Sequence, residues 1–213
     1  MSRLFAVRSV RLGSICAVLS LLAAPAGAQT FAGSDVVAAT ARELAATIQA
    51  RRAEFEADPY QLYALVDDIL LPHFDMMRGC RGILAQYWTG LDSAERNRFV
   101  IAFYNYLVAA YGTALLHFNQ DTLRVLPFNG DATASPARIS SILTMNDGTE
   151  VDVDFVMVST PEGWKVVDVV AEGVSYVKTY RSQFSVDIAI AGLNSVLEWL
   201  AEKGATRFPA ARP

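Results

Sequence analysis

The spacing of apolar residues changes at Gly173, and this change constrains the fold more than any other feature of the chain. Before it, the valine-rich stretch from Trp164 to Val170 follows a turn at 160–163 and is typical of a strand. After it, apolar residues recur at three- and four-residue steps, which predicts one long helix up to Leu200. The helical set is Phe184, Val186, Ile188, Ile190, Leu193, Leu197 and Leu200. So broad an apolar surface must be covered, so we expect this helix to be packed.

The spacing of two residues that marks a strand begins well before Trp164. Four strands are predicted, at 122–128, 138–145, 150–159 and 164–171. Short connections such as 146–148 (Asn-Asp-Gly) imply antiparallel neighbours. In the third strand, Val151, Val153, Phe155 and Met157 share one face, so one side of the sheet is strongly apolar. The expected fold class is α+β, a four-stranded antiparallel sheet packed against several helices.

Helices are predicted before the sheet. One covers 35–57, a second follows Asp58 and ends before Pro72, and a third begins at a capping box formed by Asp92 and Glu95 and runs to about Gly112. The third helix has one apolar stripe of Phe99, Phe103, Tyr106 and Ala110 and another of Val100, Tyr104, Leu107 and Tyr111. Such a helix is either a plain core helix or one whose second side lines a cavity, and the pattern leaves both open.

The first 28 residues have the composition of a secretory signal peptide. Three arginines precede an apolar run from Ile15 to Ala24, which is shorter than the roughly 20 residues of a membrane span, and the small residues at 26–28 fit a cleavage site after Ala28. We therefore expect an exported soluble protein with a single α+β domain at 29–204 and a disordered tail at 205–213.

Charge and cysteine content exclude several kinds of function. Without the three leader arginines, 15 basic residues face 22 acidic ones, and the net charge becomes −7. This balance argues against nucleic-acid binding and against simple electrostatic adhesion to anionic lipid. Cys80 is then the single cysteine, so it has no disulfide partner within the chain, and we expect a small buried apolar residue there.

Residue constellations for catalysis or metal binding are missing from the sequence. His73 and His117 lack the spacing of a zinc site, and His73 is expected at a helix end. Asp168 stands out because it interrupts a run of valines, and a buried carboxylate needs a partner. Arg181 or Tyr180 is the expected partner, in a structural latch between the sheet and the C-terminal helix. The alternative is a catalytic base at Asp168 on a cone-shaped α+β enzyme fold.

The residues around the strand–helix junction resemble those of the MlaC family, periplasmic phospholipid-binding proteins of the Mla lipid-asymmetry pathway that are also called toluene-tolerance proteins. The residues that carry the resemblance are Trp164-Lys165-Val166, Asp168, Gly173-Val174-Ser175, Tyr180-Arg181, Gln183-Phe184 and Gly192, and further back Pro72, Asp75, Tyr87-Trp88, Phe99, Phe103 and Tyr111. The chain departs from the family at Ala85, where a glycine is usual. Since alanine needs more room, close helix packing at Ala85 is questioned.

The resemblance implies a periplasmic, non-enzymatic carrier without a cofactor, whose apolar cavity between sheet and helices holds the acyl chains of a phospholipid. Its implied partners are an inner-membrane ABC transporter complex and an outer-membrane lipoprotein-porin complex. The residues expected to line the cavity are Phe103, Leu107, Tyr111, Leu143, Val153, Phe155, Met157 and Val169. Two alternatives stay open, a hopanoid-like polycyclic cargo and a pure interaction module with a filled core.

Overall fold

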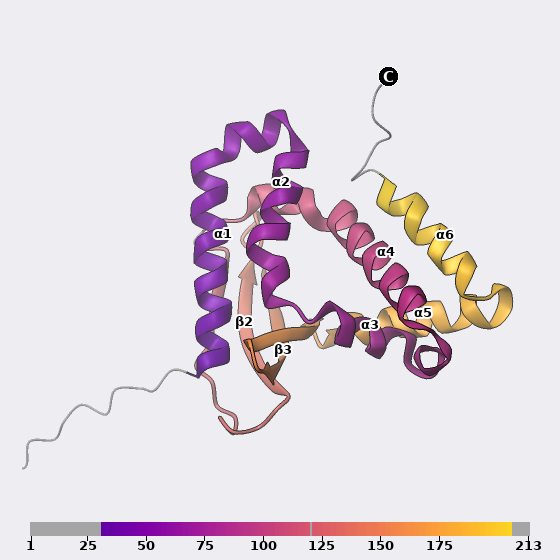
Figure 1. The fold of residues 1–213 in the computed structure, drawn as a ribbon. Coiled ribbons are helices and arrows are strands. Elements are labelled where there is room, and N and C mark those ends of the chain that lie inside the picture. The colour runs from indigo at the N-terminus through magenta and orange to yellow at the C-terminus, as the bar shows by residue number, and fades with distance from the viewer. Residues whose placement is uncertain (1–30, 120, 206–213) are drawn as a thin grey trace, which may run out of the picture.

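The computed structural model describes residues 31–119 and 121–205 (Figure 1). The predicted signal peptide and nearly all of the predicted tail lie outside these residues. The helices of the first half are α1 (Ala32–Ala57), α2 (Pro59–Leu65), the π-helical turn η1 (Val66–Leu70), the 3-10 turns η2 (Leu71–His73), η3 (Ala85–Gly90) and η4 (Gly112–His117), and the α-helices α3 (Met76–Leu84) and α4 (Ser93–Tyr111). The second half contains β1 (Leu123–Val125), β2 (Ala137–Thr144), β3 (Glu150–Thr160), β4 (Gly163–Ala171), β5 (Val174–Ser175), α5 (Tyr176–Ala191) and α6 (Leu193–Gly204).

The sheet has five antiparallel strands in the order β1-β2-β3-β4-β5. The predicted α+β class is confirmed, but the predicted count of four strands is wrong by one. The extra strand, β5, has only two residues, and it exists because Val170 and Ala171 pair with Ser175 and Val174 across a tight turn. A strand this short leaves no alternating pattern in the sequence.

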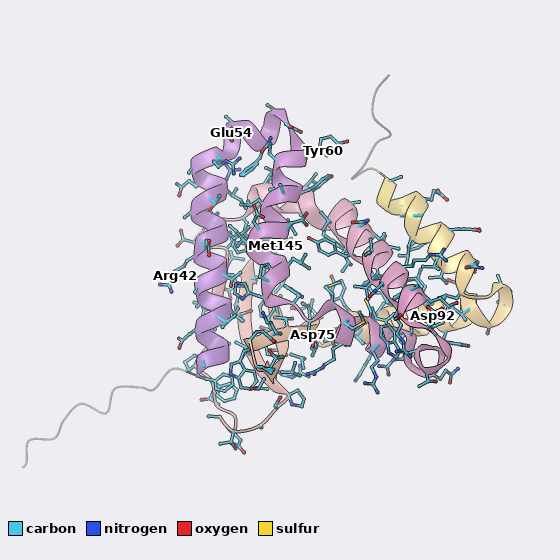
Figure 2. The ribbon with its side chains drawn as sticks, in the orientation of Figure 1. Arg42, Glu54, Tyr60, Asp75, Asp92 and Met145 are labelled. Carbon is cyan, nitrogen blue, oxygen red and sulfur yellow. The ribbon has the colours of Figure 1, made fainter. Side chains whose placement is uncertain are left out.

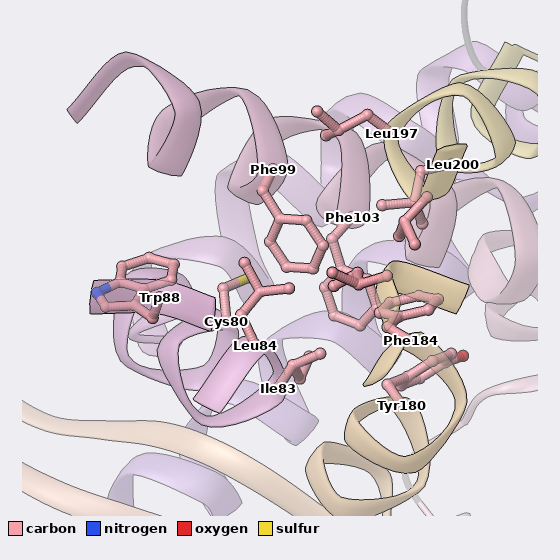
Figure 3. Packing of buried hydrophobic residues seen from close by; sticks show 12 residues of the cluster. Cys80, Ile83, Leu84, Trp88, Phe99, Phe103, Tyr180, Phe184, Leu197 and Leu200 are labelled. Atoms are coloured by element: carbon pink, nitrogen blue, oxygen red, sulfur yellow. The ribbon is translucent and has the colours of Figure 1, made fainter. Parts of the chain in front are cut away.

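The helices form two groups, one of α1 and α2 and the other of α3, α4, α5 and α6 (Figure 1). Helix α1 packs directly on the sheet, where Phe31 and Val37 join Ile139, Met157 and Val166 in one buried cluster. Figure 1 shows α2 beside α1, and α4 running next to α6 at the other end of the molecule. The second group has its own core, in which aromatic and aliphatic side chains of α3, α4, α5 and α6 interlock (Figure 3).

The predicted C-terminal helix is broken in two at Gly192. This residue has φ 78°, a left-handed conformation that favours glycine, and it separates α5 from α6. The buried side of α5 is Tyr180, Phe184 and Ile188, whereas Ile190 is 80% exposed. The single stripe predicted through Val186 and Ile190 was therefore wrong, because the turn at Gly192 resets the helical face.

Helix α4 begins at the predicted capping box. The Asp92 carboxylate accepts a hydrogen bond from the Glu95 backbone N–H at 2.8 Å, and the Glu95 carboxylate accepts one from the Asp92 backbone N–H at 2.9 Å. By length and composition alone, Ser93–His117 is apolar enough to cross a membrane, although only 22% of its most apolar window is buried. Most residues of that window are therefore half-buried or exposed, and Ile101 is 60% exposed.

Ala85 shows why its position in the chain favours glycine. Its backbone has φ 48° and ψ −112°, a region that residues with a Cβ atom rarely adopt. The side chain itself is exposed. The expected difficulty in helix packing was therefore misplaced, because the constraint lies in the backbone of Ala85 and not in the space around it.

Candidate functional site

A cavity of about 640 Å³ lies between the sheet and the helices. Figure 2 shows side chains filling much of the fold, with Asp75 at the start of α3 and Met145 just after β2, both on the cavity wall. The sheet contributes Leu143, Met145, Val151, Val153, 166–169 and Ala171, and α4 with η4 contributes Phe103, Tyr104, Leu107, Val108, Tyr111, Gly112 and Leu115. The remaining wall is Val66, Leu70 and Leu71, then Phe74, Asp75, Met76, Gly79, Cys80 and Ile83, and finally Tyr176, Val177 and Tyr180.

Six of the eight residues expected to line a cavity lie on this wall. They are Phe103, Leu107, Tyr111, Leu143, Val153 and Val169. The other two were misplaced. Met157 is fully buried in the cluster beneath α1, and Phe155 packs against the same cluster. Both residues are on the apolar face of β3, but α1 fills the space above them, so the strand pattern could not separate the filled part of that face from the hollow part.

Three of the four residues of the second stripe of α4 face the cavity, and the fourth, Val100, packs against the helical core. Tyr104, Leu107 and Tyr111 line the cavity, whereas Phe99 is fully buried in the helical core. The choice left open by the sequence is thereby decided in favour of a helix that packs on one side and lines a cavity on the other.

Three exposed residues mark the mouth of the cavity. Tyr111 at the end of α4 is 46% exposed, Met145 after β2 is 49% exposed, and Tyr176 at the start of α5 is 38% exposed. Every other lining residue is buried or half-buried. The ends of α4 and β2 and the start of α5 thus carry the solvent-exposed part of the cavity wall.

Charge on the cavity wall is confined to two carboxylates among the described residues, Asp75 and Asp168. Asp75 caps α3, because its carboxylate accepts a hydrogen bond from the Arg78 backbone N–H at 2.9 Å. No lysine, arginine or histidine of the described chain lines the cavity. The wall is therefore suited to hydrocarbon. Its two carboxylates lie at the starts of helices, where a negative charge is favourable.

Asp168 joins β4 to α5, but through partners other than those expected. One carboxylate oxygen accepts a hydrogen bond from the Ser175 hydroxyl at 2.6 Å, and the other accepts one from the Val177 backbone N–H at 3.0 Å. Arg181 instead donates from Nε to the Gly82 carbonyl oxygen at 2.7 Å, which ties α5 to α3. The carboxylate acts as a cap for α5, and both of its oxygens are engaged.

Tyr180 belongs to a chain of tyrosine hydroxyls. Its hydroxyl lies 3.4 Å from that of Tyr106 and 3.3 Å from that of Tyr111. Burial, followed by these hydrogen bonds, raises the pKa of Tyr180 far above its usual range, so the hydroxyl stays protonated. A fourth tyrosine, Tyr104, also lines the cavity, and its hydroxyl donates a hydrogen bond to the carboxylate of Asp67 on η1.

Several lining residues were not singled out from the sequence. Val66 and Leu70 sit on a π-helical turn, and Cys80 and Ile83 come from the short helix α3. Their apolar character was evident, and Cys80 is buried as expected. However, an apolar residue beside a cavity and one in a packed core leave the same pattern, so no signal in one sequence separates them.

Comparison with known proteins agrees with this architecture. A family model described as MlaC protein matches residues 38–202. The toluene tolerance protein Ttg2D of Pseudomonas putida is 29% identical over 152 residues, which cover 71% of this chain and 70% of that protein. The structure of a phospholipid-binding protein from Ralstonia solanacearum, in complex with a phospholipid, has the same fold, with a TM-score of 0.74 at 23% identity, over 84% of this chain and 98% of that one. Since the family match covers far more than half of its length, the chain belongs to the MlaC family.

Proposed function

We propose that this protein is a lipid carrier that holds the acyl chains of a phospholipid in the cavity between sheet and helices. The observation that carries the proposal is the cavity itself, about 640 Å³ of space with an almost entirely apolar wall and a mouth open to solvent. Membership of the MlaC family and the phospholipid bound to the Ralstonia solanacearum protein of the same fold support the proposal.

An empty cavity of this size would be expensive for the fold. An apolar wall that no side chain covers loses the van der Waals contacts that it would make in a packed core. Water entering through the mouth reduces this cost, but it makes poor contacts with an apolar wall. A hydrocarbon guest is the natural occupant.

The lipid also gains free energy when its acyl chains are shielded from water. Exposing one acyl chain of about 15 methylenes to water costs on the order of 12 kcal/mol, at ~0.8 kcal/mol per methylene. Transfer from a bilayer into the cavity exchanges one apolar environment for another, so its cost is small. To carry the lipid, the protein therefore has to shield the acyl chains from water, and no bond has to be broken. The proposed function needs neither a cofactor nor a catalytic group.

The finer part of the proposal concerns the route of the lipid. We propose a periplasmic shuttle that exchanges phospholipid between an outer-membrane lipoprotein-porin complex and an inner-membrane ABC transporter complex. Support comes from the MlaC family match and from the leader-like first 28 residues of the sequence. A carrier of this kind must release its cargo to a partner, which fits a mouth that is open to solvent.

Mass spectrometry of the protein purified from the periplasm under native conditions tests the binding step. We expect complexes heavier than the polypeptide, and extraction of the bound material should yield phospholipid. A hopanoid-like lipid in the extract would replace phospholipid as the cargo. Protein that carries no lipid, and whose thermal stability is unchanged when lipid is added, would refute the carrier proposal in favour of a pure interaction module.

A further inference from the structure

A chain of three tyrosine hydroxyls reaches the cavity wall near the mouth. Tyr111 and Tyr180 line the cavity, and their hydroxyl oxygens lie 3.3 Å apart, while Tyr106 continues the chain from Tyr180 at 3.4 Å. The Tyr180 ring packs in the helical core, and its hydroxyl points away from that core (Figure 3). These side chains bring α4 and α5 together at the cavity wall.

We propose that this hydroxyl chain, presented by Tyr111 and Tyr180, binds the ester carbonyl of a diacyl lipid, so that the protein prefers ester-linked over ether-linked lipids. The inference rests on the proposed function, because it assumes that acyl chains occupy the cavity. It adds a polar recognition site to a wall that otherwise offers undirected contacts.

The position of Tyr111 matches the position of the ester. Tyr111 is 46% exposed at the mouth, while Tyr180, its hydrogen-bond partner, is 6% exposed. A lipid with its tails inside and its headgroup in solvent must place its glycerol ester linkages at this boundary. Tyrosine is enriched at the same boundary in membranes, where its ring contacts hydrocarbon and its hydroxyl meets polar groups.

The hydrogen-bond inventory leaves one donor available. As the structure has it, Tyr180 donates to Tyr106, so Tyr111 donates to Tyr180 and the unused hydrogen of the three belongs to Tyr106. Rotation of the hydroxyl hydrogens reverses both bonds without moving an oxygen atom, and the unused hydrogen then lies at Tyr111, where a carbonyl oxygen would accept it. An ether oxygen is a weaker acceptor, and the carbonyl that would meet Tyr111 is missing from an ether lipid.

Competition between matched lipids tests the proposal on delipidated protein. Phosphatidylcholines with the same headgroup and chain length, one diester and one diether, should differ in affinity by roughly fivefold in wild-type protein, the size of one net hydrogen bond. In Tyr111→Phe and Tyr180→Phe this ratio should fall towards one, while affinity for the diether lipid stays the same. Tyr87→Phe is the matched control, since its hydroxyl donates to the Ser185 carbonyl at 3.3 Å and Tyr87 does not line the cavity.

The possible results distinguish failure of the ester site from failure of the carrier function. Equal affinity for both lipids in wild-type protein, or an unchanged ratio in Tyr111→Phe, would overturn the ester site while leaving the carrier function intact. Equal loss of affinity for both lipids in Tyr111→Phe would mean that the hydroxyl meets the phosphate, which also overturns it. Wild-type protein that binds neither lipid would refute the carrier function itself. Because Tyr111 is half exposed, its variant keeps the test decisive even where Tyr180→Phe fails to fold.

Discussion

The Asp168 carboxylate accepts a hydrogen bond from the Ser175 hydroxyl at 2.6 Å, across the tight turn that connects β4 to α5. Ser175 in turn caps α5, because its hydroxyl accepts a hydrogen bond from the Lys178 backbone N–H at 3.0 Å. Sheet and helix are thus joined by a continuous series of hydrogen bonds. The start of α5 also carries Tyr176 and Tyr180 on the cavity wall, so this joint positions the mouth.

Removing the Asp168 carboxylate should weaken the connection between β4 and α5. We expect Asp168→Ala to lower the free energy of unfolding by about 1–3 kcal/mol, because the partly buried Ser175 hydroxyl and Val177 N–H lose their acceptor. Urea denaturation measures the change. Asp154→Ala is the control, since Asp154 pairs with Arg138 in a partly exposed ion pair, with side chains 24% and 56% exposed, whose loss should cost about 1 kcal/mol. Equal effects in the two variants would contradict a structural role for Asp168.

Filling the cavity should displace its guest without unfolding the protein. Leu143 on β2 lines the cavity, whereas its neighbour Ile142 points to the other face of the sheet. We expect Leu143→Trp to lose most of its co-purifying lipid and to keep or raise its melting temperature, because the larger ring occupies existing space. Ile142→Trp should retain lipid at the wild-type level. Lipid extraction and quantification separate the two variants, and equal lipid content would count against this wall of the cavity.

Replacing Ala85 by glycine should stabilise the folded protein. With φ 48° and ψ −112°, it holds a conformation that costs a residue other than glycine about 1–3 kcal/mol. We expect Ala85→Gly to raise the free energy of unfolding by about 1 kcal/mol, the remainder being lost to the greater freedom of glycine in the unfolded chain. Ala46→Gly, at an exposed position within α1, should instead lower it by about 1 kcal/mol. Chemical denaturation of both variants reads out these opposite signs.

Local signals in the sequence were enough for most of the fold. The four main strands, the capping box before α4 and the positions of α1 and α2 all followed from spacing and from turn residues. The two features that were missed, a fifth strand and a helix break, leave no distinct local pattern. The strand β5 exists through pairing with β4, and the break at Gly192 depends on a backbone conformation that glycine permits but does not require.

The cavity, by contrast, depends on contacts between residues that are far apart in the chain. The apolar faces of α4 and β3 were evident, yet Phe155 and Val153, two residues apart on one face, have different surroundings. Helix α1 covers Phe155 and leaves Val153 open to the hollow. Periodicity reports that a side chain avoids water, but it does not report whether protein or a guest takes the place of that water.

Cys80 should make the stability of the protein fall in alkaline solution. Burial raises the pKa of the Cys80 thiol far above its ordinary value, so the folded protein keeps the proton that the unfolded chain loses above about pH 9. The unfolded state then binds fewer protons than the folded state, and the free energy of unfolding decreases by up to about 1.4 kcal/mol per pH unit. Below pH 8 this contribution is fully present and constant. We expect the stability advantage of wild-type protein over Cys80→Ala to shrink between about pH 9 and pH 10, in urea titrations of the two proteins at matched lipid content. Parallel curves over that interval would mean that the thiol ionises as readily in the folded protein as in the unfolded one, and that the cavity wall beside Cys80 is wet.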